Sequence, residues 1–322
     1  MDLDRMLAMC RRDQWKLTDL DWSKAPRALS RDDEEAIVQY FTDMAQIELL
    51  AGELFKEQKR RATDPRLREI FGTFVADEAR HSAVATRLAA HYDVHKYRVY
   101  RPSESLARFF PHFVRAVTYL SDEIANAYIT GGELVLDVAL LRSINDFVAD
   151  EMSEAAMELI NRDESRHIAV DYHMVEYYAS DAYSAELARR PSRPVRERLV
   201  AAWTFANVLW YAAPFFREVF FEPMNRVDPT GRRIKEAMKR MQLLGAKPGV
   251  SERPFSRFMA GVRDAYNSPL GRTFVGGVLA RIAGVPPELL RDLYTSEEWT
   301  RASRMSFDDL AADALAAKAV AG

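Results

Sequence analysis

The 322-residue sequence contains a single cysteine, Cys10. One thiol per chain excludes an intrachain disulfide framework and the cysteine clusters that hold iron–sulfur centres or rubredoxin-type iron. Glycine and proline are also scarce, with 13 and 14 residues, whereas alanine, leucine, glutamate and arginine are abundant. This composition favours a mostly helical protein.

Charge and hydropathy exclude further classes of protein. The 45 lysines and arginines are balanced by 48 aspartates and glutamates, so there is no basic excess of the kind that binds nucleic acid. No run of about 18 apolar residues indicates a membrane-spanning helix. The N-terminal residues lack the apolar core of a signal peptide. We therefore expect a cytoplasmic protein that contacts neither nucleic acid nor a membrane.

Turn and capping signals divide the chain into three parts. Residues 1–29 carry no long periodic stretch, so we expect an irregular N-terminal segment packed on the body of the protein. Residues 30–180 show apolar positions at helical spacing and predict a bundle of four long helices. These are expected at about residues 30–61, 65–92, 111–145 and 152–178, with a long connection at 91–105.

Two prolines in residues 181–194 end this unit, and residues 195–322 predict a helical C-terminal extension packed on the bundle. Aromatic residues recur at helical spacing in its first helix, 195–222, so we expect most of them to lie in the core. They include Trp203, Trp210, Phe215 and Phe216. No segment alternates like a strand over more than a few residues, and the predicted fold class is all-α.

One short motif occurs twice. Asp-Glu-x-Arg-His stands at residues 77–81 and again at 163–167. Glu and His are three positions apart in both copies, so on a helix they share one face. A di-metal carboxylate site in a helix bundle needs two such helices and one further Glu from each of two others. The repeat therefore predicts that a glutamate lies on the helix before each copy.

Glu48 and Glu133 meet this requirement. Glu48 lies 30 residues before Glu78, and the midpoint falls beside the turn signal Asp64-Pro65. Glu133 lies 31 residues before Glu164, with its midpoint at about 148–149. If each pair of helices forms an antiparallel hairpin, both ligands of the pair reach the same height. The chain thus predicts two hairpins of the same design.

Each of the two upstream glutamates has a competitor. Glu53 lies five residues after Glu48, about 140° around the helix, so both cannot face one metal. Glu123 competes with Glu133 but needs a longer loop. We favour Glu48 and Glu133 because they give the two hairpins matching spacing.

With these motifs, residues 30–180 resemble the ferritin-like di-iron carboxylate superfamily. The resemblance implies a ferritin-like four-helix bundle holding two irons, or iron and manganese, and a function in O₂ activation. It implies that each metal is bound by two glutamates and one histidine, with Glu78 and Glu164 bridging the metals at the O₂ site. The implied sets are Glu48, Glu78 and His81 for one metal, and Glu133, Glu164 and His167 for the other.

The aspartate before each bridging glutamate has an expected role of its own. A metal-bound histidine usually donates its second N–H to a carboxylate, which fixes its tautomer. Asp77 and Asp163 are placed to orient the histidine of the opposite hairpin, and Arg80 and Arg166 to pair with these carboxylates.

Other positions separate the branches of this superfamily. About 140 residues follow the bundle, which argues against an iron-storage protein. The position of the radical tyrosine in ribonucleotide reductase small subunits is Ala85, with Asp171 as its counterpart, although Tyr40 and Tyr172 remain candidate redox-active residues. The extra histidine of the arylamine N-oxygenases is replaced by Ile160.

We therefore expect an O₂-activating oxidoreductase that oxidises a small or medium apolar organic substrate. Hydroxylation, desaturation, N-oxygenation and oxidative C–C cleavage all stay open. The alternatives are an iron-binding or ferroxidase-like protein and a radical-generating subunit like that of ribonucleotide reductase. Electrons are expected from an external donor, and the chain is expected to form a homodimer.

Adjacent glycines suggest where a substrate lies. Gly131 and Gly132 directly precede Glu133, where glycine in a helix costs about 0.5–1 kcal/mol each. Either the helix is distorted there, for example by a π-bulge, or another group approaches closely. An apolar pocket is expected beside the metals, with these candidate lining residues: Met44, Ala51, Gly52, Phe74, Tyr128 and Thr130.

Overall fold

The computed structural model describes residues 1–274, 276–283 and 285–320, and in this part of the chain all regular structure is helical. Two helices, α2 (Arg31–Arg61) and α3 (Pro65–Tyr92), form the first hairpin. Ser30 caps α2, and Asp64 caps α3 by accepting a hydrogen bond from the Arg66 backbone N–H. The turn at residues 62–64 lies where the spacing of Glu48 and Glu78 predicted it.

The second hairpin contains a distorted helix. α5 (Asp122–Glu133) continues without a break into the π-helix η2 (Leu134–Leu141) and then into α6 (Arg142–Val148). Ala149 follows in a left-handed conformation with φ of 50°, and Asp150 caps α7 (Glu151–Ala179). This turn also lies at the predicted midpoint. The π-helix begins two residues after Gly132, the second of the two adjacent glycines.

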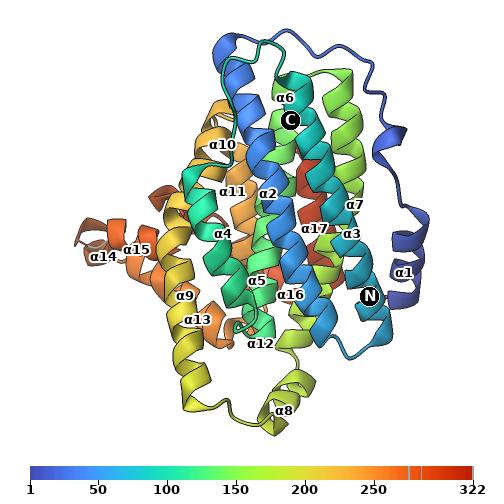
Figure 1. Ribbon diagram of the computed structural model, residues 1–322. Helices are drawn as coiled ribbons and strands as arrows, with labels where there is room; N and C mark the ends of the chain where they lie inside the picture. Colours follow the sequence, from blue (N-terminus) through green and yellow to red (C-terminus); the bar gives the residue numbers. More distant parts are fainter. Residues whose placement is uncertain (275, 284, 321–322) are drawn as a thin grey trace.

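The two hairpins pack side by side and enclose one core (Figure 1). α2 contacts α3 and α5, and α7 likewise contacts α3 and α5, so the four helices form a closed ring. We call α2, α3, α5 and α7 the central four helices. They carry the large buried side chains Phe41, Phe55, Phe71, Phe74, Ile37, Met44, Ile70, Leu88 and Tyr172.

The third helix does not begin at residue 111 as expected. A separate helix, α4 (Glu104–Val117), contains Pro111, and α5 begins only after Ser121, which caps it. The Arg61 guanidinium donates hydrogen bonds to the carbonyl oxygens of Val117, Thr118 and Leu120. These bonds satisfy the carbonyls at the end of α4. Arg61 lies more than 50 residues before these carbonyls, so no local sequence pattern indicated that α4 ends here.

The N-terminal segment is also more regular than expected. It contains α1 (Leu3–Arg12), capped by Asp2, and the short 3₁₀ helix η1 (Leu17–Asp19). Leu3, Met6, Leu7 and Cys10 form one buried face of α1, which packs on α3. α1 is too short for its apolar periodicity to stand out in the sequence. Packing of its buried face against α3 stabilises it as a helix.

The C-terminal part wraps around the central four helices. Its longest helix, α9 (Val195–Phe216), packs on α4, while α11 (Arg232–Leu244) and α17 (Phe307–Val320) both contact η2. The other elements are α8 (Asp181–Arg189), η3 (Arg217–Phe221), α10 (Glu222–Val227), α12 (Pro248–Ser251), α13 (Pro254–Asn267), α14 (Pro269–Phe274), α15 (Gly276–Ala283), η4 (Pro287–Leu290) and α16 (Ser296–Arg304).

The expectation that the aromatic residues of α9 are mostly core is wrong for both tryptophans. Phe215 is buried and Phe216 half-buried, but Trp203 is 67% and Trp210 63% exposed. α9 packs on α4 and also contacts α15, but neither helix covers the two tryptophan side chains.

Two helical stretches are long and apolar enough to cross a membrane by length and composition alone. Asp122–Val148 is 78% buried in its most apolar window, as expected of a core helix. Val195–Val227 has the same mean hydropathy of 1.4 but is only 22% buried. Charged residues interrupt both stretches, so neither contains the unbroken run of apolar residues that the sequence was searched for.

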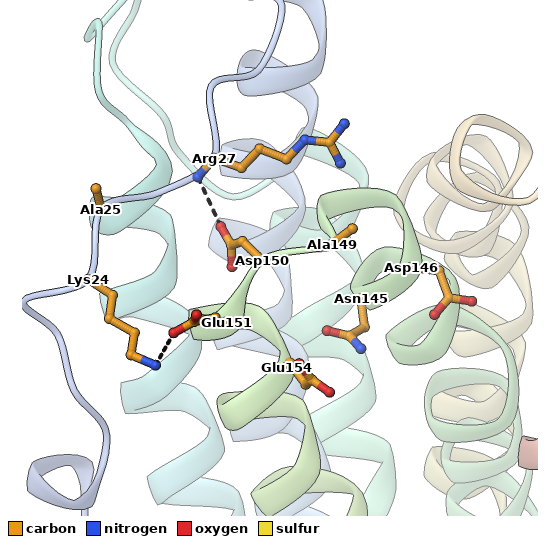
Figure 2. Close-up of a pocket in the computed structure, with 9 residues that line it drawn as sticks. All are labelled: Lys24, Ala25, Arg27, Asn145, Asp146, Ala149, Asp150, Glu151 and Glu154. Carbon is orange, nitrogen blue, oxygen red and sulfur yellow. Dashed lines mark hydrogen bonds and ion pairs between the residues drawn. The ribbon is translucent and has the colours of Figure 1, made fainter.

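The turn between α6 and α7 lines a surface cavity of about 670 Å³ (Figure 2). Asp150 lies at its centre and makes three contacts. Its carboxylate accepts hydrogen bonds from the backbone N–H groups of Ser153, at 2.8 Å, and Arg27, at 3.1 Å, and from the Tyr92 hydroxyl, at 2.8 Å. This one side chain joins the N-terminal segment to both hairpins.

Replacing Asp150 with alanine should therefore destabilise the protein by about 2 kcal/mol, because it removes a helix cap and two further hydrogen bonds. The measurement is urea unfolding followed by circular dichroism. Glu158→Ala, an exposed site on the same helix, is the matched control and should change the free energy of unfolding by less than about 0.5 kcal/mol. Equal effects of the two substitutions would contradict this role.

Candidate metal centre

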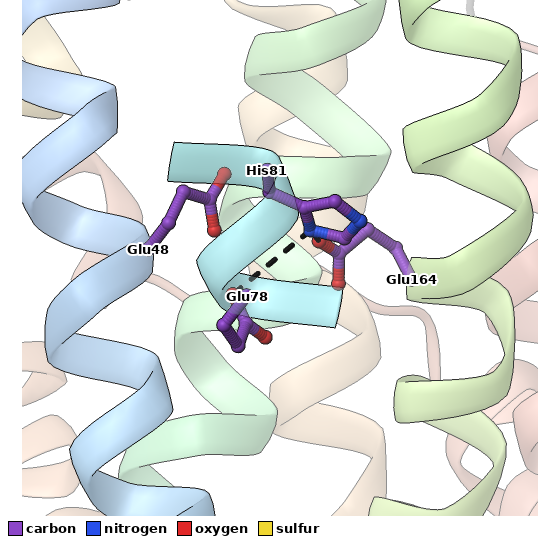
Figure 3. Close-up of side chains that lie close together, drawn as sticks. All are labelled: Glu48, Glu78, His81 and Glu164. Carbon is purple, nitrogen blue, oxygen red and sulfur yellow. Dashed lines mark ion pairs between the residues drawn. The ribbon is translucent and has the colours of Figure 1, made fainter. Parts of the chain in front are cut away.

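Six acidic and histidine side chains meet at mid-height between the central four helices. α2 supplies Glu48, α3 supplies Glu78 and His81, α5 supplies Glu133, and α7 supplies Glu164 and His167. All six are at most 4% exposed. Figure 3 shows four of them pointing toward one another from three helices.

The six residues form two overlapping groups. Glu48, Glu78, His81 and Glu164 each offer one ligand atom within 4.8 Å of the others, and so do Glu78, Glu133, Glu164 and His167. Glu78 and Glu164 belong to both groups. These two carboxylates could therefore contact a metal ion held by either group.

The imidazole rings point the same nitrogen inward. Nδ1 of His81 lies 3.0 Å from the Glu164 carboxylate, and Nδ1 of His167 lies 2.9 Å from the other oxygen of Glu164. The outer nitrogens face aspartates of the opposite hairpin. Nε2 of His81 is 3.1 Å from Asp163, and Nε2 of His167 is 3.4 Å from Asp77. Each aspartate thus holds a proton on Nε2, so that the inner Nδ1 is the nitrogen that can bind a metal once its own proton is lost.

Arginines neutralise the two aspartates. Arg80 pairs with Asp77 and lies 3.3 Å from Asp163, while Arg166 pairs with Asp163 and lies 3.8 Å from Asp77. The four side chains form a buried layer with no net charge beside the six inner residues. All four of these aspartates and arginines belong to the two copies of the Asp-Glu-x-Arg-His motif.

The N-terminal segment completes this layer, which the sequence did not predict. The Trp15 indole N–H donates to Asp163 at 2.7 Å, and its ring stacks on His81 with 6.3 Å between centroids. The Gln14 amide lies 3.3 Å from Asp77. A tryptophan far from the motif in sequence offered no signal for this contact.

Burial and mutual repulsion shift the pKa values of the inner groups. Burial, followed by the neighbouring Glu78 charge, raises the pKa of Glu48, and burial with Glu164 does the same for the pKa of Glu133. For Glu164, burial is outweighed by His167 and His81, which lower its pKa. For both histidines burial lowers the pKa, but the surrounding carboxylates outweigh it and raise the pKa.

The donor set fits divalent metal ions. In the described part of the chain, no oxygen of Glu48, Glu78 or Glu164 and neither inner Nδ1 atom makes a hydrogen bond of normal geometry. Buried polar atoms are normally satisfied, so this cluster of orphaned groups calls for a ligand. Four carboxylates carry four negative charges, which two divalent cations balance. Oxygen and imidazole ligands suit iron and manganese.

The competing glutamates lie outside this cluster. Glu53 pairs with Lys56 near the surface, at 2.6 Å. Glu123 is half-buried, near Arg253, and burial raises its pKa. The structure therefore brings Glu48 and Glu133 to the centre and leaves the alternatives apart.

A buried ion pair lies beside Glu133. Asp137, one turn further along on η2, pairs with Lys318 of α17, and Lys318 also donates to the Ser165 hydroxyl at 2.9 Å. Burial raises the pKa of Asp137 to about 6, although Lys318 opposes the shift. Asp137 is four residues after Glu133, so both share one helical face, but nothing in the sequence indicated its partner near the end of the chain.

The glycines before Glu133 have two explanations at once. η2 begins at Leu134, so the helix is distorted directly after them. A Cβ atom on Gly131 would lie 2.9 Å from the Met241 side chain of α11, whereas Gly132 has open space around it. Gly131 thus permits the close approach of α11.

The candidate substrate residues divide into two groups. Phe74 lies beside the centre, with its ring centroid 4.1 Å from that of His167, and a Cβ on Gly52 would be 3.5 Å from Glu78. Met44 and Thr130 are also buried in the core. Ala51 is only half-buried, and Tyr128 faces Phe113 and Phe255 instead.

Asp171 is a further buried group that the sequence did not single out as part of the site. It lies one turn after His167, and neither carboxylate oxygen has a hydrogen-bond partner in the described residues. Burial raises its pKa. The other four histidines lie elsewhere, beside Trp22, Glu34, Tyr211 and Glu176 respectively: His91, His95, His112 and His173.

No known family model matches the chain, and no solved structure is significantly similar to it. What the molecule itself shows is a helical protein with a buried cluster of carboxylates and histidines that could hold a metal ion.

We predict that Glu48→Ala lowers the metal content of iron-loaded protein below that of the wild type, which should bind two ions per chain, one for each ligand group. The loss follows because no nearby carboxylate replaces Glu48. Glu53→Ala is the matched control and should keep the wild-type content. Elemental analysis of both variants, with helix content checked by circular dichroism, distinguishes the outcomes. Equal metal content in the two variants would count against the assignment.

The metal-free protein should lose stability as pH rises from about 5 to 8. Glu48, Glu133, His81 and His167 all have raised pKa values, so the folded chain binds their protons more tightly than the unfolded chain. The lowered pKa of Glu164 acts in the opposite sense, but only below its usual value of 4.5. Urea unfolding with a chelator present measures the slope.

Metal-loaded protein should show a smaller slope over the same range, because the ions take the place of the protons. Glu48→Gln should also flatten the slope of the metal-free protein. A metal-free protein that gains stability with rising pH would show that these groups are not buried as described.

Proposed function

We propose that this protein is a ferritin-like di-metal oxidoreductase that uses O₂ to oxidise a small or medium apolar organic molecule. The observation that carries the proposal is the pair of ligand groups that share Glu78 and Glu164. It is supported by the repetition of one hairpin design, with Glu on the first helix and Glu-x-x-His on the second.

Two iron ions, or one iron and one manganese, would supply the electrons and open coordination positions needed to reduce O₂. The side chains of this protein would bind the ions and orient the ligand atoms around them. Glu48 and Glu133 would each bind one metal, and Glu78 and Glu164 both. Asp77 and Asp163 hold the histidine protons on the outer nitrogens, so that the inner Nδ1 atoms are ligands.

The surroundings of the centre support an apolar substrate. The rings of Phe55 and Phe74 lie 5.1 and 4.1 Å from that of His167, and Met44 is fully buried on the same side of α2 as Glu48. Such side chains exclude water and offer few polar contacts to a substrate. The type of oxidation stays open. Since the chain has one cysteine and no redox cofactor motif, electrons would come from an external donor.

The C-terminal extension favours an oxidoreductase over a storage protein. α11 and α17 contact η2, and Lys318 reaches Asp137 one turn from Glu133. The extension therefore builds one side of the centre. A reaction on a specific substrate needs such a defined environment, whereas deposition of iron does not. A radical-generating role has less support, because Ala85 occupies the expected tyrosine position.

The proposal predicts that protein loaded anaerobically with ferrous iron consumes O₂ and changes its absorbance in one rapid phase. Glu78→Ala and His167→Ala should abolish both signals, and Glu53→Ala should leave them unchanged. O₂ uptake and stopped-flow absorbance are the measurements. Continued oxidation of added ferrous iron into a retained mineral would indicate storage instead. Iron-loaded wild type that ignores O₂ would refute the proposed function.

A further inference from the structure

α9 carries an exposed apolar stripe along its outer face. Val195, Leu199 and Trp203 follow one another at four-residue spacing and therefore lie on one side of the helix. They are 69%, 66% and 67% exposed. Ala202 and Ala206 are exposed on the same side, and Trp210 lies further along it. We call this surface the α9 stripe.

Arginines surround the α9 stripe. On a helical projection, Arg196 lies about 60° to one side of Leu199 and Arg198 about 100° to the other. Arg189 ends α8, six residues before α9 begins, and Arg217 directly follows α9 and lies 3.5 Å from Glu222; all four arginines are exposed. Arg189, Arg196 and Arg198 form no ion pair with the described part of the chain. Residues 198–217 contain no acidic residue.

We propose that the α9 stripe docks on an anionic phospholipid surface. A helix that lies in a membrane interface buries an apolar face with tryptophan and leucine, and holds arginines at its edges against the lipid phosphates. Tryptophan itself is favoured at this depth. The stripe and its arginines match both requirements. This differs from the absence of membrane contact that we expected from the sequence.

The opposite face of α9 fixes how the helix meets the membrane. Phe215 stacks on Phe109 of α4 at 4.3 Å, and Tyr211 stacks on His112 at 4.5 Å. Thr204 and Val208 are also buried on this side. Spanning the bilayer would break these contacts, so the geometry points to α9 lying on the surface while it stays packed on the protein.

A second copy of the chain is a poorer match for the same stripe. A two-fold dimer brings identical patches together. With the two α9 helices antiparallel, Arg196 and Arg198 would face the end that carries Arg217, and with the helices parallel they would face each other. Glu197 stands between these two arginines but lies about 160° from Leu199 on a helical projection, and residues 198–217 contain no acid to offset the repulsion.

The test is co-sedimentation of full-length protein with vesicles of phosphatidylcholine, alone or mixed with phosphatidylglycerol. The protein should sediment with the mixed vesicles and bind pure phosphatidylcholine at least about tenfold more weakly. Each arginine near an anionic surface contributes roughly fivefold in affinity. Replacing Arg189, Arg196 and Arg198 together with glutamine should therefore weaken binding by about a hundredfold, and high salt should mimic the effect.

Trp203→Glu should abolish binding to the mixed vesicles without changing helix or metal content, because the side chain is exposed. Val99→Glu is the matched control: Val99 is 83% exposed, lies outside α9, and its replacement should leave binding unchanged. Absence of binding to mixed vesicles overturns the proposal. So does a dimer, seen by analytical ultracentrifugation without lipid, that Trp203→Glu dissociates.

Discussion

The burial of four carboxylates at one point of the core is the constraint on which the rest of this structure depends. Glu48, Glu78, Glu133 and Glu164 come from the central four helices and are nearly inaccessible to water. Charges of one sign in such a place repel one another and lose their hydration, which is costly unless cations or protons compensate. The raised pKa values of Glu48 and Glu133 express that cost in the metal-free protein.

The layers around the carboxylates manage this charge in an ordered way. His81 and His167 present Nδ1 inward, Asp163 and Asp77 hold the protons on the outer Nε2 atoms, and arginines neutralise the aspartates. The aspartates and arginines around the centre compensate one another. The four central carboxylates are left with an excess of negative charge. Bound metal ions could compensate this excess of negative charge, which lies in a small volume that bulk solvent does not reach.

Local and pairwise signals in the sequence explain why the hairpins were predictable. In an antiparallel hairpin, two residues lie side by side only if the turn falls midway between them in sequence. The turns at Asp64 and Ala149 lie at the midpoints between Glu48 and Glu78 and between Glu133 and Glu164. The pairing of each aspartate with the opposite histidine followed from the same symmetry. Contacts with no repeat and no local signature were missed. Trp15 on Asp163, Arg61 on the end of α4, and Lys318 on Asp137 are of this kind.

The exposure of Trp203 was missed for a different physical reason. Helical periodicity shows that a face is apolar, but not whether the protein has another layer to cover it. Here α9 packs on α4 and contacts α15, but the face that carries Trp203 remains at the surface.

The distorted helix connects the centre to the end of the chain. In η2 the backbone departs from the regular α-helical pattern, and such segments persist where neighbouring structure stabilises them. Here α11 and α17 supply that structure: Met241 packs on Gly131, and Lys318 compensates the buried charge of Asp137. The position of Glu133 thus depends on residues more than a hundred positions further along the chain. The central four helices supply the ligands, while the C-terminal helices stabilise the distorted segment that holds one of them.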